Sequence, residues 1–211
     1  MKRKRITSKK NTGINISASL AILAAILLCG IVAGCITASY IGDEAGAALR
    51  SYVLNYTKTL GVIPSVGELF PGAIWNVYKY PLCTFLFGFT VLGIVLIPGA
   101  VALRGFFLSF SVATMIRLYG SSGLTLALAM FGVSSLIGIP CLLIISAQGF
   151  HAARSFARVM AGGKRVIIGS VFPRGYFVIF GVCMAALFAA VLLEVFLTPK
   201  LVALVAVSVL K

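Results

Sequence analysis

Residues able to carry acid–base or metal chemistry are few in this sequence and lie far apart. The 211 residues include one histidine, His151, and four acidic residues. A catalytic metal site needs several His, Cys or carboxylate ligands close together, and the sequence shows no such group. His151 falls in a basic segment, whereas Glu194 falls near the end of a late apolar tract. The two are expected at opposite ends of helices, so the sequence predicts no acid–base pair, no cofactor and no enzyme.

Hydroxyl and thiol groups give a second set of candidates, and all of them lie in apolar tracts. A nucleophilic serine needs a neighbouring base, which is missing here, so the serines are expected to form hydrogen bonds between helices. The cysteines are expected to act as small packing residues rather than disulfide partners or metal ligands. The residues concerned are Ser109, Ser111, Ser134 and Ser135, and Cys29, Cys35, Cys83, Cys141 and Cys183.

The composition is that of an integral membrane protein. Hydrophobic residues make up 61% of the chain, charged residues 10%, and the mean hydropathy is +1.12. A soluble domain of this size could not bury that much apolar surface. The formal charge of +14 comes from an N-terminal basic cluster and from residues beside apolar runs. This pattern indicates membrane orientation and contact with the lipid bilayer rather than nucleic-acid binding.

The apolar tracts predict an all-α, polytopic membrane protein with about five transmembrane helices, since each tract can supply the roughly 20 residues that one pass needs. The predicted segments are a basic tail (1–13), a first helix (14–41), an extracytoplasmic segment (42–74), a hairpin of two helices (75–118), a short outer loop with a fourth helix (119–148), a basic loop (149–175), a fifth helix (176–197) and a short outer tail (198–211).

Orientation follows from the basic residues, which concentrate on the cytoplasmic side of membrane proteins. The N-terminal tail and the 149–175 loop are the most basic segments, so both are expected in the cytoplasm and the C-terminus outside. Because the tail and the 149–175 loop lie on the same side, an even number of passes must separate these two segments. This requires two helices in 75–118. Arg104 is expected at the cytoplasmic turn of this hairpin, with Pro98 weakening the preceding helix end. The alternative is a single kinked helix with a buried arginine.

Aromatic and repeated patterns refine this layout. Trp75, Tyr78 and Tyr80 are expected to form an outer aromatic belt, with Lys79 reaching toward the headgroups. Phe87-Gly88 recurs as Phe131-Gly132, each followed at the same spacing by Gly-Phe, which suggests a repeated helical hairpin.

The extracytoplasmic segment is a candidate for docking a partner. Tyr52 and Tyr56 fall on the apolar stripe of an amphipathic helix, and Glu68 is expected in an irregular return loop. Aromatic residues are frequent anchors of protein contacts. The alternative is a linker lying on the membrane surface.

Small residues and prolines leave two further alternatives open. Gly30 and Gly34, and likewise Gly105 and Ser109, have the four-residue spacing that suits close helix packing within the chain, with a partner or in a homo-oligomer. Helices broken by Pro98 and Pro140 could instead frame the site of a small-solute or ion transporter, with Glu194 as a proton carrier.

The chain resembles the stage II sporulation protein M family. The resemblance lies in the basic tail and in two tracts, "FGFTVLGIVLIPGAVALRGFFLSFSVATMI" and "LALAMFGVSSLIGIPCLLIISAQGFHAARSF", and is strongest over residues 75–158. The resemblance implies a non-catalytic scaffold in the bacterial cell membrane that works during engulfment of the forespore. It implies as partners stage II sporulation proteins P and D, which remodel peptidoglycan.

Overall fold

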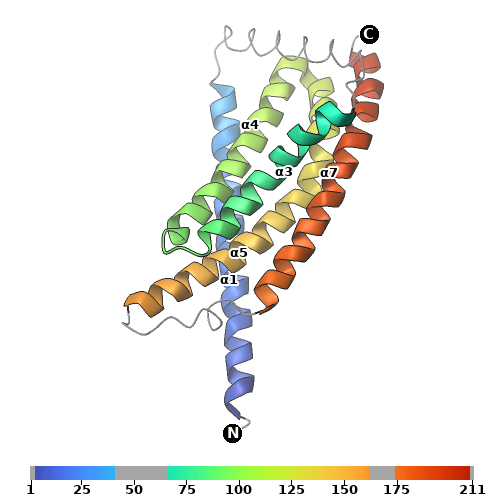
Figure 1. Cartoon of the computed structure of the whole chain (residues 1–211). Coiled ribbons are helices and arrows are strands. Elements are labelled where there is room, and N and C mark those ends of the chain that lie inside the picture. The colour runs from blue at the N-terminus through green and yellow to red at the C-terminus, as the bar shows by residue number, and fades with distance from the viewer. Residues whose placement is uncertain (1–2, 41–65, 162–173, 210–211) are drawn as a thin grey trace.

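The structure, a computed structural model, describes residues 3–40, 66–161 and 174–209, and all its elements are helices (Figure 1). This confirms the all-α prediction. The elements are α1 (Arg3–Ser39), α3 (Val66–Phe87), α4 (Gly93–Ala127), the π-helix η1 (Leu128–Gly132), α5 (Val133–Ala161) and α7 (Arg174–Val209).

Within residues 3–40, 66–161 and 174–209, four helices are long and apolar enough to cross a membrane. Their spans are Ser17–Ser39, Gly93–Arg117, Ser134–Ala157 and Gly175–Leu197. Large apolar side chains such as Leu28 and Leu136 face outward from these spans, as they would toward lipid. The protein is therefore membrane-embedded. α3 is shorter and more polar, and it packs on α4, α5 and α7 inside the same bundle.

The turn between α3 and α4 lies at residues 88–92, so the prediction that Arg104 occupies this turn is wrong. Gly88 permits the turn because its Cα lies against α5: a Cβ there would come within 3.0 Å of the Gly149 Cα. Arg104 instead lies inside α4, and Pro98 falls in the second turn of that helix rather than at a helix end. The predicted hairpin of two helices is present as α3 and α4, but its first helix covers residues 66–87 instead of beginning near residue 75.

Three other predicted boundaries also change. Glu68 lies in the first turn of α3 rather than in an irregular loop, and His151 lies within α5 rather than in a basic loop. Residues 198–209 continue α7 instead of forming a separate tail. The helices continue past the proline, glycine and charged residues that suggested these boundaries. Tyr52 and Tyr56 lie outside the described residues.

The two Phe-Gly stretches are not copies of one hairpin. Gly88 lies in the turn after α3, whereas Gly132 ends η1 and leads directly into α5. The first stretch therefore reverses the chain, while the second continues along one helix. The chain reversal before η1 uses another glycine, Gly120, whose φ of 61° is the left-handed conformation that glycine adopts readily.

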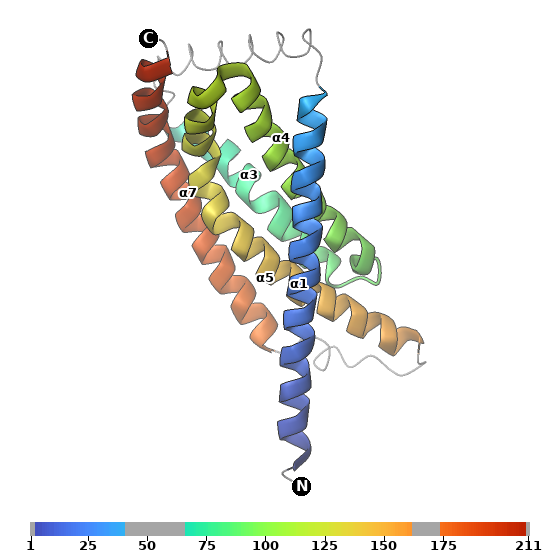
Figure 2. The same cartoon turned by 180° about the vertical axis from the view of Figure 1, so that it is seen from behind.

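Among the described residues, the two largest apolar clusters of the core both include residues of α5. One joins α3, α5 and α7 around Leu187 and Val191, and the other joins α1, α4 and α5 around Leu23 and Ile97. Seen from behind (Figure 2), α1 crosses α4 and α5 on the face opposite to α3. α5 thus lies between two helix layers.

Small residues allow α1 and α4 to approach closely, as their spacing predicted. Gly30 faces the backbone carbonyl of Ala102, and Gly34 faces Ser109 and the carbonyl of Phe106. In the opposite direction, a Cβ on Gly105 would lie 2.7 Å from the Leu27 carbonyl oxygen. Such backbone proximity maximises dispersion contacts where lipid supplies no hydrophobic driving force.

Arg117 of α4 forms hydrogen bonds with the C-terminal end of α1. Its guanidinium donates hydrogen bonds to the carbonyls of Ala38 (3.1 Å) and Ser39 (2.9 Å), the last residues of α1. These carbonyls have no partner within the helix, and a cation also balances the negative end of its dipole.

The close packing predicts that Gly105→Leu destabilises the protein. The leucine would push α1 away from α4, and overpacking of this kind costs about 1–3 kcal/mol or more. Thermal unfolding of the purified protein in detergent should therefore show a lower midpoint. Gly99→Leu is the matched control on the same helix, because a Cβ at Gly99 meets nothing within 4 Å. Equal midpoints for the two variants would contradict the α1–α4 contact.

Candidate functional site

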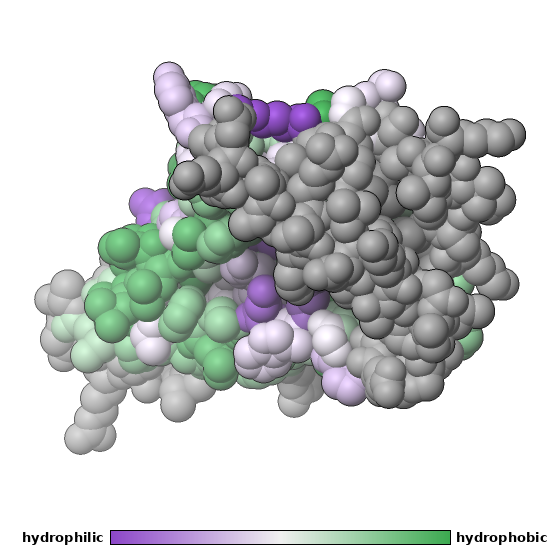
Figure 3. Space-filling view, turned by 90° about the horizontal axis from the view of Figure 1, so that it is seen from above, coloured by the Kyte–Doolittle hydropathy of each residue, from purple (hydrophilic) through white to green (hydrophobic). Residues whose placement is uncertain are grey.

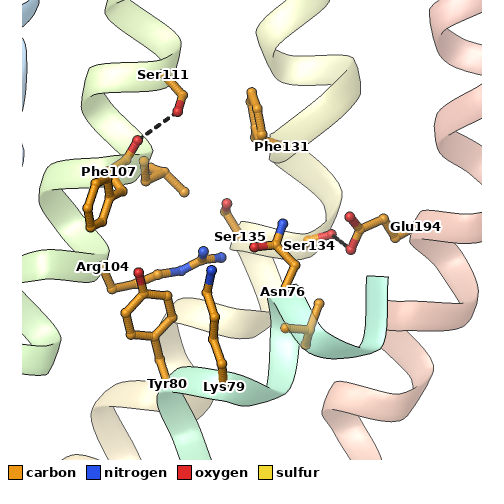
Figure 4. A pocket seen from close by; sticks show the side chains of 12 residues that line it. Asn76, Lys79, Tyr80, Arg104, Phe107, Ser111, Phe131, Ser134, Ser135 and Glu194 are labelled. Carbon is orange, nitrogen blue, oxygen red and sulfur yellow. Dashed lines mark hydrogen bonds between the residues drawn. The ribbon is translucent and has the colours of Figure 1, made fainter. Parts of the chain in front are cut away.

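A polar cavity of about 250 Å³ lies between α3, α4, α5 and α7, with Phe131 of η1 at its edge. Polar side chains from all four helices line it, although the surrounding tracts are apolar (Figure 4). These polar residues are Asn76, Lys79, Tyr80, Arg104, Ser111, Ser134, Ser135 and Glu194.

α3 presents one polar face to this cavity. Lys79 and Tyr80 follow Asn76 by three and four residues, which places each of them next to Asn76 on the helix surface. The Tyr80 ring contacts two cations: its centroid lies 5.1 Å from the Lys79 Nζ and 5.4 Å from the Arg104 guanidinium carbon. Ring faces attract cations, and the attraction grows when water is excluded.

Arg104 enters the cavity from the middle of α4. It lies eleven residues after Gly93, or on the order of 16 Å along the helix axis, which is about half the hydrocarbon thickness of a bilayer. Figure 4 shows its guanidinium beside Lys79, pointing toward α5. The site, rather than the headgroup region, therefore solvates this charge. This matches the buried-arginine alternative for the residue but not the single-helix topology that accompanied it.

The opposite wall combines hydroxyl groups with one carboxylate. The Ser134 hydroxyl donates a 2.5 Å hydrogen bond to the Glu194 Oε2, which joins α5 to α7. Ser135, the next residue, has a buried hydroxyl without a hydrogen-bond partner among the described residues. The two serines lie two and three residues after the end of η1, and π-helical turns are frequent at functional sites.

The predicted role of the serines is therefore confirmed for Ser134 and wrong for two others. The hydroxyl groups of Ser109 and Ser111 donate to carbonyls of their own helix, those of Phe106 and Phe107. A hydroxyl in a helix interior commonly bonds the preceding turn. Ser111 still lines the cavity, whereas Ser109 packs on Gly34 of α1.

Aromatic residues fill the space between α3 and α7 at the end of the bundle that holds the 88–92 turn. Phe85 stacks on Phe180 with ring centroids 3.8 Å apart, and on Tyr176 at 5.4 Å. Above them, the Tyr78 hydroxyl donates to the Met184 carbonyl at 3.0 Å.

The predicted outer aromatic belt is accordingly wrong for two of its three members. Tyr78 joins α3 to α7, and Tyr80 lines the cavity. Lys79 also points into the cavity rather than toward the headgroups (Figure 4). Of the three, Trp75 alone remains strongly exposed, at 70%.

Two predicted site residues lie away from the cavity lining. Pro98 is in the second turn of α4 and Pro140 is in α5, where each removes one backbone hydrogen bond. In the sequence, the signal for the cavity was the set of polar residues inside apolar tracts, since such residues are functional candidates by default. Asn76 was missed because it is uncharged and stands beside Trp75, a pattern that is typical of the membrane–water interface.

The side chains of the site suit the binding of a small polar ligand. Among residues 3–40, 66–161 and 174–209, no group of three His, Cys, Asp or Glu residues could hold a metal ion. The cavity does bring two cations, one carboxylate and several hydroxyl groups within reach of one small ligand. Seen from above (Figure 3), hydrophilic atoms gather near the middle of the molecule beside an apolar flank.

The fold and site define the chain as an all-α polytopic membrane protein with a polar cavity inside its helix bundle. The model of the family "Stage II sporulation protein M" matches residues 23–199, which include α3, α4 and α5 in full, parts of α1 and α7, and the whole cavity lining. The chain belongs to this family, and it is a sporulation-related membrane protein. Neither the curated proteins nor the solved structures include a significant match.

The hydrogen bond between Ser134 and Glu194 predicts that Ser134→Ala destabilises the protein. The substitution leaves a half-buried carboxylate with one acceptor unsatisfied, at a cost of about 1–3 kcal/mol. The unfolding midpoint in detergent should fall. Ser111→Ala is the matched control, because its hydroxyl bonds only its own helix and lines the same cavity. An equal or smaller effect of Ser134→Ala would contradict the α5–α7 link.

Proposed function

We propose that the protein is a non-catalytic membrane scaffold that anchors peptidoglycan-remodelling enzymes during forespore engulfment. The match of the family model to residues 23–199 is the observation that supports this role most strongly. The partners proposed are the wall hydrolases implied by the sequence resemblance, stage II sporulation proteins P and D. Close packing of α1 on α4 agrees with a structural part.

The proposed orientation places the N-terminus in the cytoplasm, with five passes and an extracytoplasmic C-terminus. In this arrangement α3 counts as a pass in addition to the four apolar spans. The basic N-terminal tail and residues 162–173 then lie on the same side as the 88–92 turn, as the positive-inside rule favours. Figure 1 fits an odd number of passes, because α1 begins and α7 ends at opposite ends of the bundle.

Thiol labelling tests this orientation. In a cysteine-free background, an impermeant maleimide should label Ser121→Cys in intact cells, because Ser121 is exposed next to the Gly120 kink. It should spare Thr90→Cys, which lies in the opposite turn. Both should react after membranes are opened. Preferential labelling of Thr90→Cys in intact cells would reverse the proposed orientation.

The partner contact is proposed to involve the segment between α1 and α3. It is the longest stretch available to an extracytoplasmic domain in the proposed topology, and Tyr52 and Tyr56 are its aromatic candidates. Small residues within the bilayer are a poorer alternative surface, because Gly105 and Ser109 already contact α1.

A membrane pull-down from sporulating cells tests the scaffold. The tagged protein should capture a wall hydrolase, and Tyr52→Ala with Tyr56→Ala should reduce that capture at least about tenfold while protein levels stay normal. Tyr40→Ala is a matched control, since Tyr40 is an exposed tyrosine at the end of α1. Unchanged capture by the double variant would contradict the proposed docking surface. If the wild-type protein captures no hydrolase, the scaffold role is wrong.

A small-solute or ion transporter is the second candidate, and the cavity is the observation that favours it. Ionisable residues inside membrane bundles commonly mark substrate pathways. Glu194 and Arg104 face the same cavity from α7 and α4. Solute flux into proteoliposomes by the purified protein alone, abolished by Arg104→Gln, would support this function over the scaffold.

A further inference from the structure

The cavity has more positive than negative charge. Lys79 and Arg104 contribute two cations, whereas Glu194 is the one carboxylate in its lining. That carboxylate accepts a hydrogen bond from Ser134 on the far side of the cavity. If all three groups are charged, one positive charge remains uncompensated in a region where charges are costly.

Several hydrogen-bond donors in the cavity also lack acceptors. Within the described ranges, Lys79 and Arg104 contact the Tyr80 ring, and neither donates a hydrogen bond or forms an ion pair there. The Ser135 hydroxyl is buried and unpartnered. Figure 4 shows Ser135 and Asn76 next to the Arg104 guanidinium and Lys79. A buried hydroxyl is expected to be hydrogen-bonded, and cations inside a helix bundle are expected to be paired, so an acceptor shared by Ser135, Lys79 and Arg104 is the missing component.

We propose that this cavity binds a phosphate group, held by Arg104, Lys79 and the Ser135 hydroxyl. The guanidinium fork can pair two phosphate oxygens, and the ammonium can contact a third as a point charge. The donors come from α4, α3 and α5, so they approach from different directions. A tetrahedral phosphate accepts bonds in such an arrangement, whereas a planar carboxylate has two oxygens in one plane.

The phosphate can come from a lipid headgroup or from a free phosphate ion. The volume of about 250 Å³ admits either. For a lipid, Phe107 lines the cavity and is also 50% exposed on the bundle surface, where an acyl chain could lie, and the phosphate would have to enter below the headgroup region. This binding site is independent of the scaffold role, because it uses residues within the bundle and needs no protein partner.

Binding can be measured with the full chain in a phosphate-free maltoside detergent after lipid removal. The probes are inorganic phosphate and dioleoyl phosphatidic acid, and dioleoylglycerol has the same acyl chains without the phosphate. Native mass spectrometry gives the number of lipids bound, and thermal unfolding gives the affinity of each probe through stabilisation. One saturable phosphatidic acid per chain, with no equivalent dioleoylglycerol, identifies a headgroup site. Saturable stabilisation by inorganic phosphate identifies a free-ion site, and both results support the proposal.

Variants assign the binding to the cavity. Arg104→Gln should weaken binding of the active probe at least about tenfold, since bonds to charged groups are the strong ones. Ser135→Ala should weaken it several-fold, and this small change keeps the test available if the arginine variant does not fold. Arg154→Gln is the control: Arg154 also lies over an aromatic ring, that of Phe150 at 5.5 Å, but outside the cavity.

Two results would overturn the proposal. One is the absence of saturable binding of both phosphate probes to the folded wild-type protein. The other is binding that Ser135→Ala and Arg104→Gln leave unchanged, or that Arg154→Gln weakens as much. Neither result bears on hydrolase capture, so the scaffold role stands or falls separately.

Discussion

A guanidinium held half-way along a membrane helix constrains the whole arrangement of this protein. A cation at that depth costs a few kcal/mol unless protein groups replace water around it. Arg104 is accommodated because α3 turns a polar face toward it and because η1 directs Ser134 and Ser135 into the same cavity. The adjacent residue, Gly105, faces α1 instead. A single turn of α4 therefore faces the polar site on one side and packs against α1 on another.

The sequence was sufficient for the fold class and for the small residues that allow close helix packing, since hydropathy and small-residue spacing are local properties. It did not identify α1 and α4 as the pair that these residues bring together. It misplaced the first hairpin because a charge in an apolar tract was taken to mark the membrane surface. The turn is determined by a tertiary contact, the approach of Gly88 to Gly149, which no local pattern reveals. The cavity was recognised only in part: Arg104 and Glu194 were noticed separately, but their meeting depends on how four helices pack.

Family membership and geometry emphasise different properties of the same chain. The family indicates a sporulation-related membrane protein, and the proposed scaffold role places the important surface outside the membrane. The structure adds a charged site within the bundle that a passive anchor would not require. Binding a phosphate group there would neutralise the cavity and hold α3, α4 and α5 together, and this would couple the bundle's stability to its lipid or ionic surroundings.

Cysteine cross-linking tests most directly whether residue 104 faces the interior of the bundle. In a cysteine-free protein in native membranes, a bifunctional methanethiosulfonate with a spacer as long as the two native side chains should bridge Tyr80→Cys and Arg104→Cys. It should not bridge Tyr80→Cys and Leu103→Cys, because Leu103 is 51% exposed on the surface of the same turn. Bridging of the Leu103 pair, with none for the Arg104 pair, would show that Arg104 points out of the bundle and would contradict the cavity.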